Sequence, residues 1–147
     1  IPRLIDMKVE PFLLASTINL IIAQRLVRKI CELCKTAYIV PLTDLKQHFP
    51  LPMIKKYLGE TIEFTVFKGQ GCKICRNTGY LGRVGVFEVL KISNEIKKLI
   101  TSKSTAEEIS NQAIGVGMKA MNEDGLEKIA RGVTTIEEVI RVTKVES

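Results

Sequence analysis

The sequence lacks the features that mark membrane-spanning, exported or disordered chains. Its longest apolar run, from Ile18 to Ala23, is interrupted by Asn19 and is far too short to cross a bilayer. It has no low-complexity tract, and no charged and apolar leader with a small-residue cleavage site. We therefore expect a folded, soluble, cytoplasmic protein. Because the chain opens on Ile1 rather than Met, we also expect a fragment of a longer protein.

Groups suited to catalysis are equally scarce. The phosphate-binding loop GxxxxGKS or GxxxxGKT is absent, so no nucleotide hydrolysis is assigned to these residues alone. The single histidine, His48, has no obvious partner for general base work, and we expect an ordinary surface or half-buried role for it. Aromatic residues able to stack on nucleic-acid bases are few: Tyr38, Phe64, Phe67 and Tyr80. No catalytic residue is predicted.

The chain does contain enough apolar residues for a core, together with an uneven charge. Its 147 residues are 46% hydrophobic, which suits one domain or one domain with a small appendage. Up to Arg83 there are 13 basic and 6 acidic residues, whereas the remainder has 9 and 10. A basic first part could bind nucleic acid, acidic lipid headgroups or an acidic protein, and a merely solvated basic surface is the plain alternative.

All four cysteines fall in two Cys-x-x-Cys pairs, Cys31 with Cys34 and Cys72 with Cys75. In a reducing compartment this spacing favours a metal, because both thiolates of a pair reach one ion and two pairs complete a tetrahedral shell. Zinc is the favoured occupant, and four protein sulfurs leave no open position for chemistry. Two disulfides, a redox pair and an iron–sulfur cluster remain as alternatives.

The segments around the cysteines predict a mixture of helices and strands. Pro11 suits the first turn of a helix that runs toward Asn19. The stretch 20–30, "LIIAQRLVRKI", fits a helix or a buried strand equally. Further on, the sequence predicts a helix over 43–49 capped by Thr43 and closed by Pro50 and Pro52, a helix over 53–58 that ends at Gly59, and strands over 61–67 and 83–90.

Beyond Ser93 the capping signals are those of helices alone. Ser93 caps a first helix, and capping boxes of Ser104 with Glu107 and of Thr134 with Glu137 open two others. Between these boxes the stretch 118–131 predicts a helix ended by Gly132. Its expected core positions are Met118, Met121, Leu126, Ile129 and Ala130.

Three stretches, in this order, resemble one protein family: "IDMKVEPFLLASTINLIIAQRLVRKICELC", "GCKICRNTGYLGRVGVFEVL" and "GMKAMNEDGLEKIARGVTTIEEVIRVT". They are similar to the C-terminal part of the GspE/PilB type II secretion and type IV pilus assembly ATPases. The resemblance implies an α/β fold class, a C-terminal piece of a RecA-like P-loop ATPase domain with an inserted tetracysteine zinc module. Residues 1–30 would end the motor core, 31–82 would form the module, and 83–147 would form a strand and a helical subdomain.

The resemblance also implies a function for the intact protein. Family members are hexameric cytoplasmic motors, attached peripherally to the inner membrane through partners, which drive pilin assembly through a membrane platform protein. Cys31, Cys34, Cys72 and Cys75 match the family's zinc ligands, while ATP and magnesium belong to the full-length protein only. Arg25, in "AQRL", would lie near the nucleotide or a subunit interface in the intact protein, or would have an ordinary structural role.

The resemblance favours a strand after Leu20. Relatives without the module join the equivalents of "AQRLVRKI" and "RVGVFEVL" by a short turn, so the two segments should be neighbouring strands whose turn the module replaces. Our leading hypothesis is that the chain is the C-terminal, non-catalytic portion of such an ATPase, inactive alone and without affinity for nucleic acid. The alternatives are a stand-alone basic zinc module that binds nucleic acid and, less expected, an enzyme complete in itself.

Overall fold

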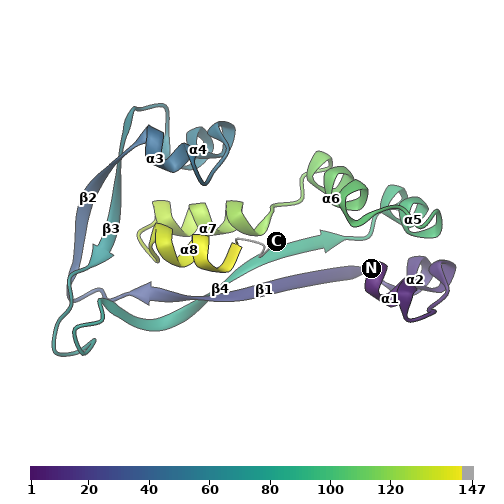
Figure 1. Ribbon diagram of the computed structural model, residues 1–147, viewed down its shortest axis with the longest axis horizontal. Helices are drawn as coiled ribbons and strands as arrows, with labels where there is room; N and C mark the ends of the chain where they lie inside the picture. The colour runs from purple at the N-terminus through teal and green to yellow at the C-terminus, as the bar shows by residue number, and fades with distance from the viewer. Residues whose placement is uncertain (144–147) are drawn as a thin grey trace. The chain divides into compact units, whose positions relative to one another are not determined.

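The computed structural model describes residues 1–143 and places eight helices and four strands within them (Figure 1). The chain divides into two compact units. The first combines residues 1–23 with 88–120, and the second combines residues 24–87 with 121–143. The mixed helix and strand content confirms the coarse fold class. The proposed segments 1–30, 31–82 and 83–147 concern the family's domain organisation and stay a prediction.

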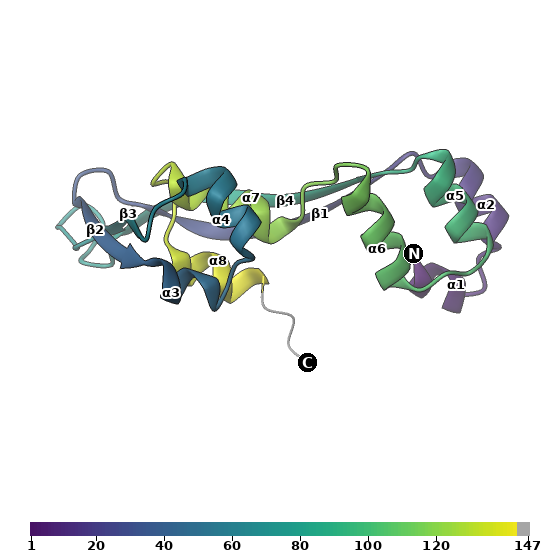
Figure 2. The same cartoon turned by 90° about the horizontal axis from the view of Figure 1, so that it is seen from above.

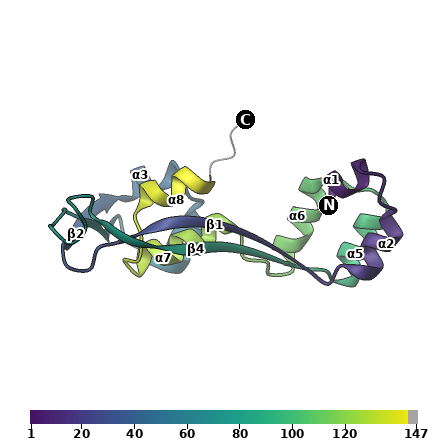
Figure 3. The same cartoon turned by 90° about the horizontal axis from the view of Figure 1, so that it is seen from below.

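Strands β1 (Leu20–Ile30) and β4 (Tyr80–Lys91) pair in a two-stranded sheet and run side by side (Figure 3). At one end the amide of Ile92 donates to the carbonyl of Asn19 over 3.1 Å, and at the other the amide of Cys31 donates to Gly79 over 2.9 Å. The two strands are therefore antiparallel. This confirms the strand interpretation of 20–30, with the cysteine-containing stretch between the two strands of the hairpin.

The first unit is built on four helices: α1 (Pro2–Asp6), α2 (Pro11–Thr17), α5 (Asn94–Thr101) and α6 (Ala106–Gly115). Proline suits the first turn of α2 because its missing amide would have no partner there. The core of this unit comprises Leu14, Ala15, Ile92, Ile96, Ile100, Ile109 and Ala113. Ser93 caps α5 as predicted, since its hydroxyl accepts from the amide of Ile96.

In the second unit, β2 (Lys35–Pro41) pairs antiparallel with β3 (Glu63–Gly69), from Lys35 opposite Gly69 to Pro41 opposite Glu63. Helices α3 (Leu42–Lys46) and α4 (Leu51–Leu58) connect the two strands, and α7 (Met121–Ala130) and α8 (Ile136–Thr143) pack on them (Figure 2). The shared core comprises Val40, Leu45, Phe49, Ile54, Phe64, Val66, Leu126, Ile129, Ile136 and Val139. Strand β2 was not predicted from the sequence.

Several predicted helix starts are wrong by one or two residues. Thr43 lies inside α3, which follows Pro41, and it caps nothing. Pro52 does not close α3, because it sits in the first turn of α4, where the ring fits without breaking a hydrogen bond. The capping box of α6 uses Thr105 and Glu108 instead of Ser104 and Glu107.

The predicted capping box of Thr134 with Glu137 is not formed. The hydroxyl of Thr134 donates to the carbonyl of Arg28 over 2.8 Å, and the hydroxyl of Thr135 accepts from the amide of Glu138 over 3.4 Å. The carboxylate of Glu138 accepts hydrogen bonds from arginine side chains instead of bonding back to the N-terminus of α8. The α8 start is therefore fixed by contacts with β1.

The predicted core positions of the helix over 118–131 are confirmed in part. Leu126 and Ile129 are completely buried. Met118 packs at the edge of the first unit's core, while Met121 and Ala130 are half-buried. The methionines therefore pack at the edges of the core. The branched side chains of Leu126 and Ile129 form the buried centre of the helix face.

Gly125 allows α7 and α8 to approach closely. A methyl group at this position would overlap the side chain of Val139. We expect Gly125→Ala to lower the free energy of unfolding by about 1–3 kcal/mol, because this overlap outweighs the better helix propensity of alanine. The matched control is Gly115→Ala, since open space surrounds Gly115 at the end of α6. Urea denaturation measures both, and equal or greater stability of the Gly125 variant would contradict the prediction.

Candidate metal centre

The β1–β4 pair and the β2–β3 pair both end at the four cysteines. Cys31 directly follows β1 and Cys34 directly precedes β2. On the other side, Cys72 and Cys75 lie in the connection from β3 to β4. The two antiparallel pairings hold these connections together, so residues 41 positions apart in sequence become neighbours.

The four sulfurs lie within 4.8 Å of one another. The Sγ atoms of Cys31 and Cys72 are 3.9 Å apart, those of Cys34 and Cys75 are 3.9 Å apart, and those of Cys72 and Cys75 are 3.7 Å apart. A tetrahedral zinc ion with Zn–S bonds of about 2.3 Å would separate its sulfurs by about 3.8 Å. A disulfide needs about 2 Å, and all four cysteines are free. The group could hold a metal ion and its spacing is consistent with zinc.

Backbone amides point at the sulfurs as they do around bound thiolates. The amide of Gly71 donates to Cys34 over 3.3 Å, and Cys75 accepts from the amides of Cys72 and Gly79 over 3.1 and 3.3 Å. Gly71 and Gly79 have φ values of 96° and 76°, which favour glycine. A methyl group on Gly79 would also overlap the backbone of Gly69. These glycines therefore let the chain fold tightly around the cysteines.

The surroundings shift the pKa values of two thiols in opposite directions. Burial raises the pKa of Cys34 to about 11, with neighbouring thiols adding to the effect. Burial also acts to raise the pKa of Cys75, but the amides of Cys72 and Gly79 outweigh it and lower the pKa to about 6. The two backbone amides therefore stabilise the thiolate form of Cys75 without a contribution from a metal ion.

The buried carboxylate of Glu138 links α8 to β1, the strand that precedes Cys31. Glu138 is 2% exposed and accepts from the backbone amide and the guanidinium of Arg28, each over 2.8 Å. Arg141 donates to the same carboxylate over 2.8 and 3.2 Å. Burial acts to raise the pKa of Glu138, but the hydrogen bonds from the two arginines outweigh it and lower the pKa to about 2. Glu138 is therefore ionised at neutral pH.

Further contacts extend this attachment to β4 and to the residue before Cys31. The guanidinium of Arg28 lies 4.1 Å from the ring centre of Tyr80, whose hydroxyl is 3.0 Å from that of Thr135. The amide of Ile30 donates to the carbonyl of Val133 over 2.9 Å. Sequence reasoning missed this network, because its hydrogen-bonded partners on different elements lie between 55 and 110 residues apart and no local pattern marks them.

The other candidate residues do not join the cysteine cluster. Arg25 is exposed on β1 and has no ion-pair partner among residues 1–143, so its role stays a prediction. His48 is exposed in the connection after α3, as expected. Within the described residues no helix is long and apolar enough to cross a membrane.

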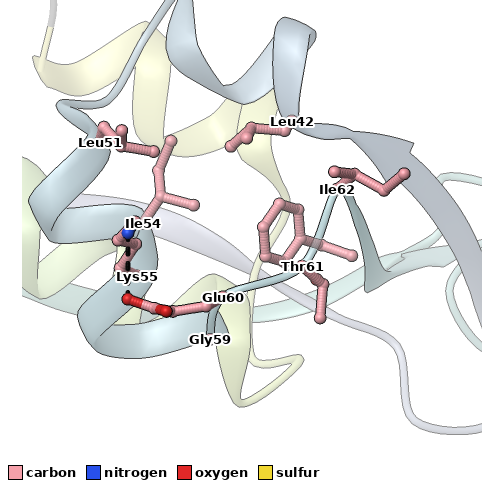
Figure 4. A pocket seen from close by; sticks show the side chains of 9 residues that line it. Leu42, Leu51, Ile54, Lys55, Gly59, Glu60, Thr61 and Ile62 are labelled. Atoms are coloured by element: carbon pink, nitrogen blue, oxygen red, sulfur yellow. Dashed lines mark hydrogen bonds and ion pairs between the residues drawn. The ribbon is translucent and has the colours of Figure 1, made fainter.

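An apolar hollow of about 530 Å³ lies between α3, α4 and the start of β3 (Figure 4). Its walls include Leu42, Ile54, Ile62 and Phe64, and an ion pair of 3.0 Å joins Lys55 to Glu60 beside it. Both of these charged side chains are largely exposed. These two charges pair with each other, and the hydroxyl of Thr61 donates to the carbonyl of Glu63, so the cysteine cluster is the better supported functional site.

Comparisons with known proteins point to one family. The family model described as "Type II/IV secretion system protein" matches residues 1–141. The chain is 41% identical over 143 residues to the type IV pilus assembly ATPase PilB of Pseudomonas aeruginosa, covering 97% of this chain and 24% of that protein. It is 36% identical over 146 residues to the type II secretion system protein E of the same species, covering 99% and 27%. The chain thus spans about a quarter of the length of these relatives.

Proposed function

The chain belongs to the type II/IV secretion system protein family, and from this premise we propose that it is the C-terminal portion of a hexameric ATPase that powers type II secretion or type IV pilus assembly. The names of its relatives support this proposal, since they are ATPases of pilus assembly and proteins of type II secretion. The portion itself would carry no catalytic residue. ATP and magnesium would bind elsewhere in the full-length protein, because these 147 residues contain no phosphate-binding loop.

The contribution of this portion is a metal-stabilised module and a helical subdomain. Cys31, Cys34, Cys72 and Cys75 would hold one zinc ion, and the gathering of their four sulfurs within 4.8 Å of one another is the observation that carries this part of the proposal. When bound, zinc would cross-link the two connections and supply no chemistry to a substrate. The segments 31–82 and 83–147 would then be the module and the subdomain, and 1–30 the end of the RecA-like motor core.

The proposed setting is the cytoplasmic face of the inner membrane. There the full-length hexamer would act on a membrane platform protein, with Arg25 near the nucleotide or a subunit interface. A stand-alone nucleic-acid-binding module is not favoured. Of the aromatic residues that could have stacked on bases, Phe64 is buried, and the rings of Tyr80, Tyr38 and Phe67 are each covered by a basic side chain.

A chimera tests the proposed function. We would replace the matching segment of Pseudomonas aeruginosa PilB with this chain and measure pilus assembly in a strain without its own PilB. We expect assembly to be restored, because the match covers 97% of this chain at 41% identity. The same chimera with Cys31→Ser and Cys72→Ser should fail. A chimera that folds and forms hexamers but assembles no pili would contradict the pilus assembly branch of the proposal.

A further inference from the structure

Residues 132–138 comprise the turn after α7 and the first residues of α8, and they contact the chain on both sides of the cysteine cluster. Thr134, Thr135 and Glu138 in this segment are at most 2% exposed. No other side chain with oxygen or nitrogen atoms is buried among residues 1–143. Burial of such a group costs free energy unless it is hydrogen-bonded. Each of the three is bonded to β1 or β4, so the segment is attached to the strands that adjoin the cysteines.

On the β1 side, the segment binds the last residues before Cys31. The hydroxyl of Thr134 donates to the carbonyl of Arg28, and the carboxylate of Glu138 accepts from the amide of Arg28, each over 2.8 Å. The amide of Ile30 donates to the backbone of the segment over 2.9 Å. Ile30 directly precedes Cys31, and both are buried. Three hydrogen bonds to the segment therefore hold the end of β1 and, with it, the position of Cys31.

On the β4 side, the segment binds the first residue of the strand. The hydroxyls of Thr135 and Tyr80 are 3.0 Å apart. Tyr80 directly follows Gly79, whose amide donates to the sulfur of Cys75 over 3.3 Å. The carbonyl of Gly79 accepts from the amide of Cys31 over 2.9 Å. Gly79 thus contacts one cysteine of each pair, and the bond to Thr135 holds the residue next to it.

The turn itself lies against the residue that follows Cys34. A methyl group on Gly132 would overlap the side chains of Lys35 and Phe67. The φ value of 65° at Gly132 also favours glycine, so the turn can approach the start of β2 closely. Lys35 directly follows Cys34. The segment therefore contacts the neighbours of Cys31 and Cys34 as well as the residue that follows Gly79.

We propose that residues 132–138 position the metal centre, so that zinc binding and the docking of α8 on β1 and β4 strengthen each other. The inference rests on the zinc site of the proposed function and adds to it residues that are not ligands. Cysteines held in place before the ion binds lower the cost of ordering the two connections around it. By thermodynamic reciprocity, bound zinc holds α8 more firmly, and loss of zinc loosens it. The docking of α8 is then a metal-dependent step.

Removal of two buried hydroxyls tests the proposal. Thr134→Val with Thr135→Val keeps the branched shape of both side chains and removes their bonds to the strands. We expect the dissociation constant for zinc to rise roughly tenfold, as it does when residues behind metal ligands are changed. Competition with a chromophoric chelator at pH 7 measures it. Tyr80→Phe is a milder variant that removes one of these bonds from the β4 side, and it should raise the constant by a smaller factor.

The matched control removes two hydroxyls elsewhere in the second unit. In Tyr57→Phe with Thr143→Val, the lost bonds are those to Glu123 and to the carbonyl of Val139, and neither adjoins a cysteine. This variant should bind zinc as the unchanged chain does. Circular dichroism of the zinc-loaded chains establishes that every variant is folded.

Hydrogen exchange measures the reciprocal effect. The amides of α8 should exchange more slowly in the zinc-loaded chain than in the chelator-treated chain. The amides of α5 and α6, in the first unit, should exchange equally in both. In the variant Thr134→Val with Thr135→Val, the protection of α8 by zinc should be smaller.

Three outcomes would overturn the inference. They are equal zinc affinity of the threonine variant and the unchanged chain, equal weakening by the control variant, and exchange of α8 that does not depend on zinc. The proposed function would survive each of them, because each is observed on a chain that binds zinc. An unchanged chain that binds no zinc would instead overturn the zinc module together with this inference.

Discussion

The chain with Cys31→Ser and Cys72→Ser is expected to purify without zinc, whereas the unchanged chain carries close to one zinc ion per molecule. Each substitution removes one thiolate from a different pair, so neither pair can complete a tetrahedral shell. Cys31 is fully buried, and serine fits its space with little change in volume. The loss should therefore report on the metal and not on packing.

The expected loss of stability is large. A ligand that binds only the folded state, present at a thousand times its dissociation constant, raises the free energy of unfolding by about 4 kcal/mol. Structural zinc contributes at least this much. We expect the free energy of unfolding to fall by about 4 kcal/mol or more in urea denaturation. The module between β1 and β4 should be affected most, since the cluster holds the ends of both strand pairs.

A chelator provides the control for the cysteine variant. Removing zinc from the unchanged chain should reduce its stability to that of the variant, and added zinc should restore only the unchanged chain. Retention of one zinc ion per chain by the double variant, or an unchanged unfolding midpoint, would remove the basis for a zinc module.

Glu138→Gln is expected to lower the free energy of unfolding by about 2–4 kcal/mol, because a neutral amide replaces a buried carboxylate that binds two arginines. The amide has one acceptor oxygen with two lone pairs, so it can keep at most two of the four hydrogen bonds that the carboxylate accepts from Arg28 and Arg141. Urea denaturation at pH 7 measures the effect. The matched control is Glu137→Gln. The side chain of Glu137 is exposed, so this substitution should change the free energy of unfolding by less than about 0.5 kcal/mol.

The pH dependence of the free energy of unfolding distinguishes the effect of the charge of Glu138 from the effect of its packing. Its pKa is lowered from 4.5 to about 2 in the folded chain, so its ionised form stabilises the fold fully above about pH 4.5. That contribution is lost as the pH falls from 4.5 toward 2. The stability difference between Glu138→Gln and the unchanged chain should therefore shrink in that window. Both chains lose zinc alike in acid, and a difference that stays constant would contradict the assigned role.

Local signals predicted the elements whose ends are marked by one unambiguous residue. Pro11 and Ser93 open α2 and α5 where the sequence places them. Where two hydroxyl residues stand together, as at Ser104 with Thr105, the sequence does not say which will cap. The choice depends on which residue takes extended backbone geometry, and that is set by the packing of the whole helix.

Strand β2 shows a second limit of local reasoning. Its residues Lys35–Pro41 form a strand only because β3 lies opposite, and β3 begins more than twenty residues later. A two-stranded sheet is marginal unless one face is covered, and here Tyr38 and Val40 pack on the core that includes α7 and α8. The paired strand β3 and the helices α7 and α8 that cover the sheet both come from segments distant in the sequence.

The sequence alone determined the family, most of the helices and the two cysteine pairs, because Cys-x-x-Cys spacing is a local property of the chain. Only the tertiary structure decided that the four sulfurs lie within 4.8 Å of one another and that Glu138 joins α8 to the strand before Cys31. Such contacts are made between residues about 40 and 110 positions apart. No short pattern encodes them, since each depends on the strand pairing and helix packing that bring the segments together.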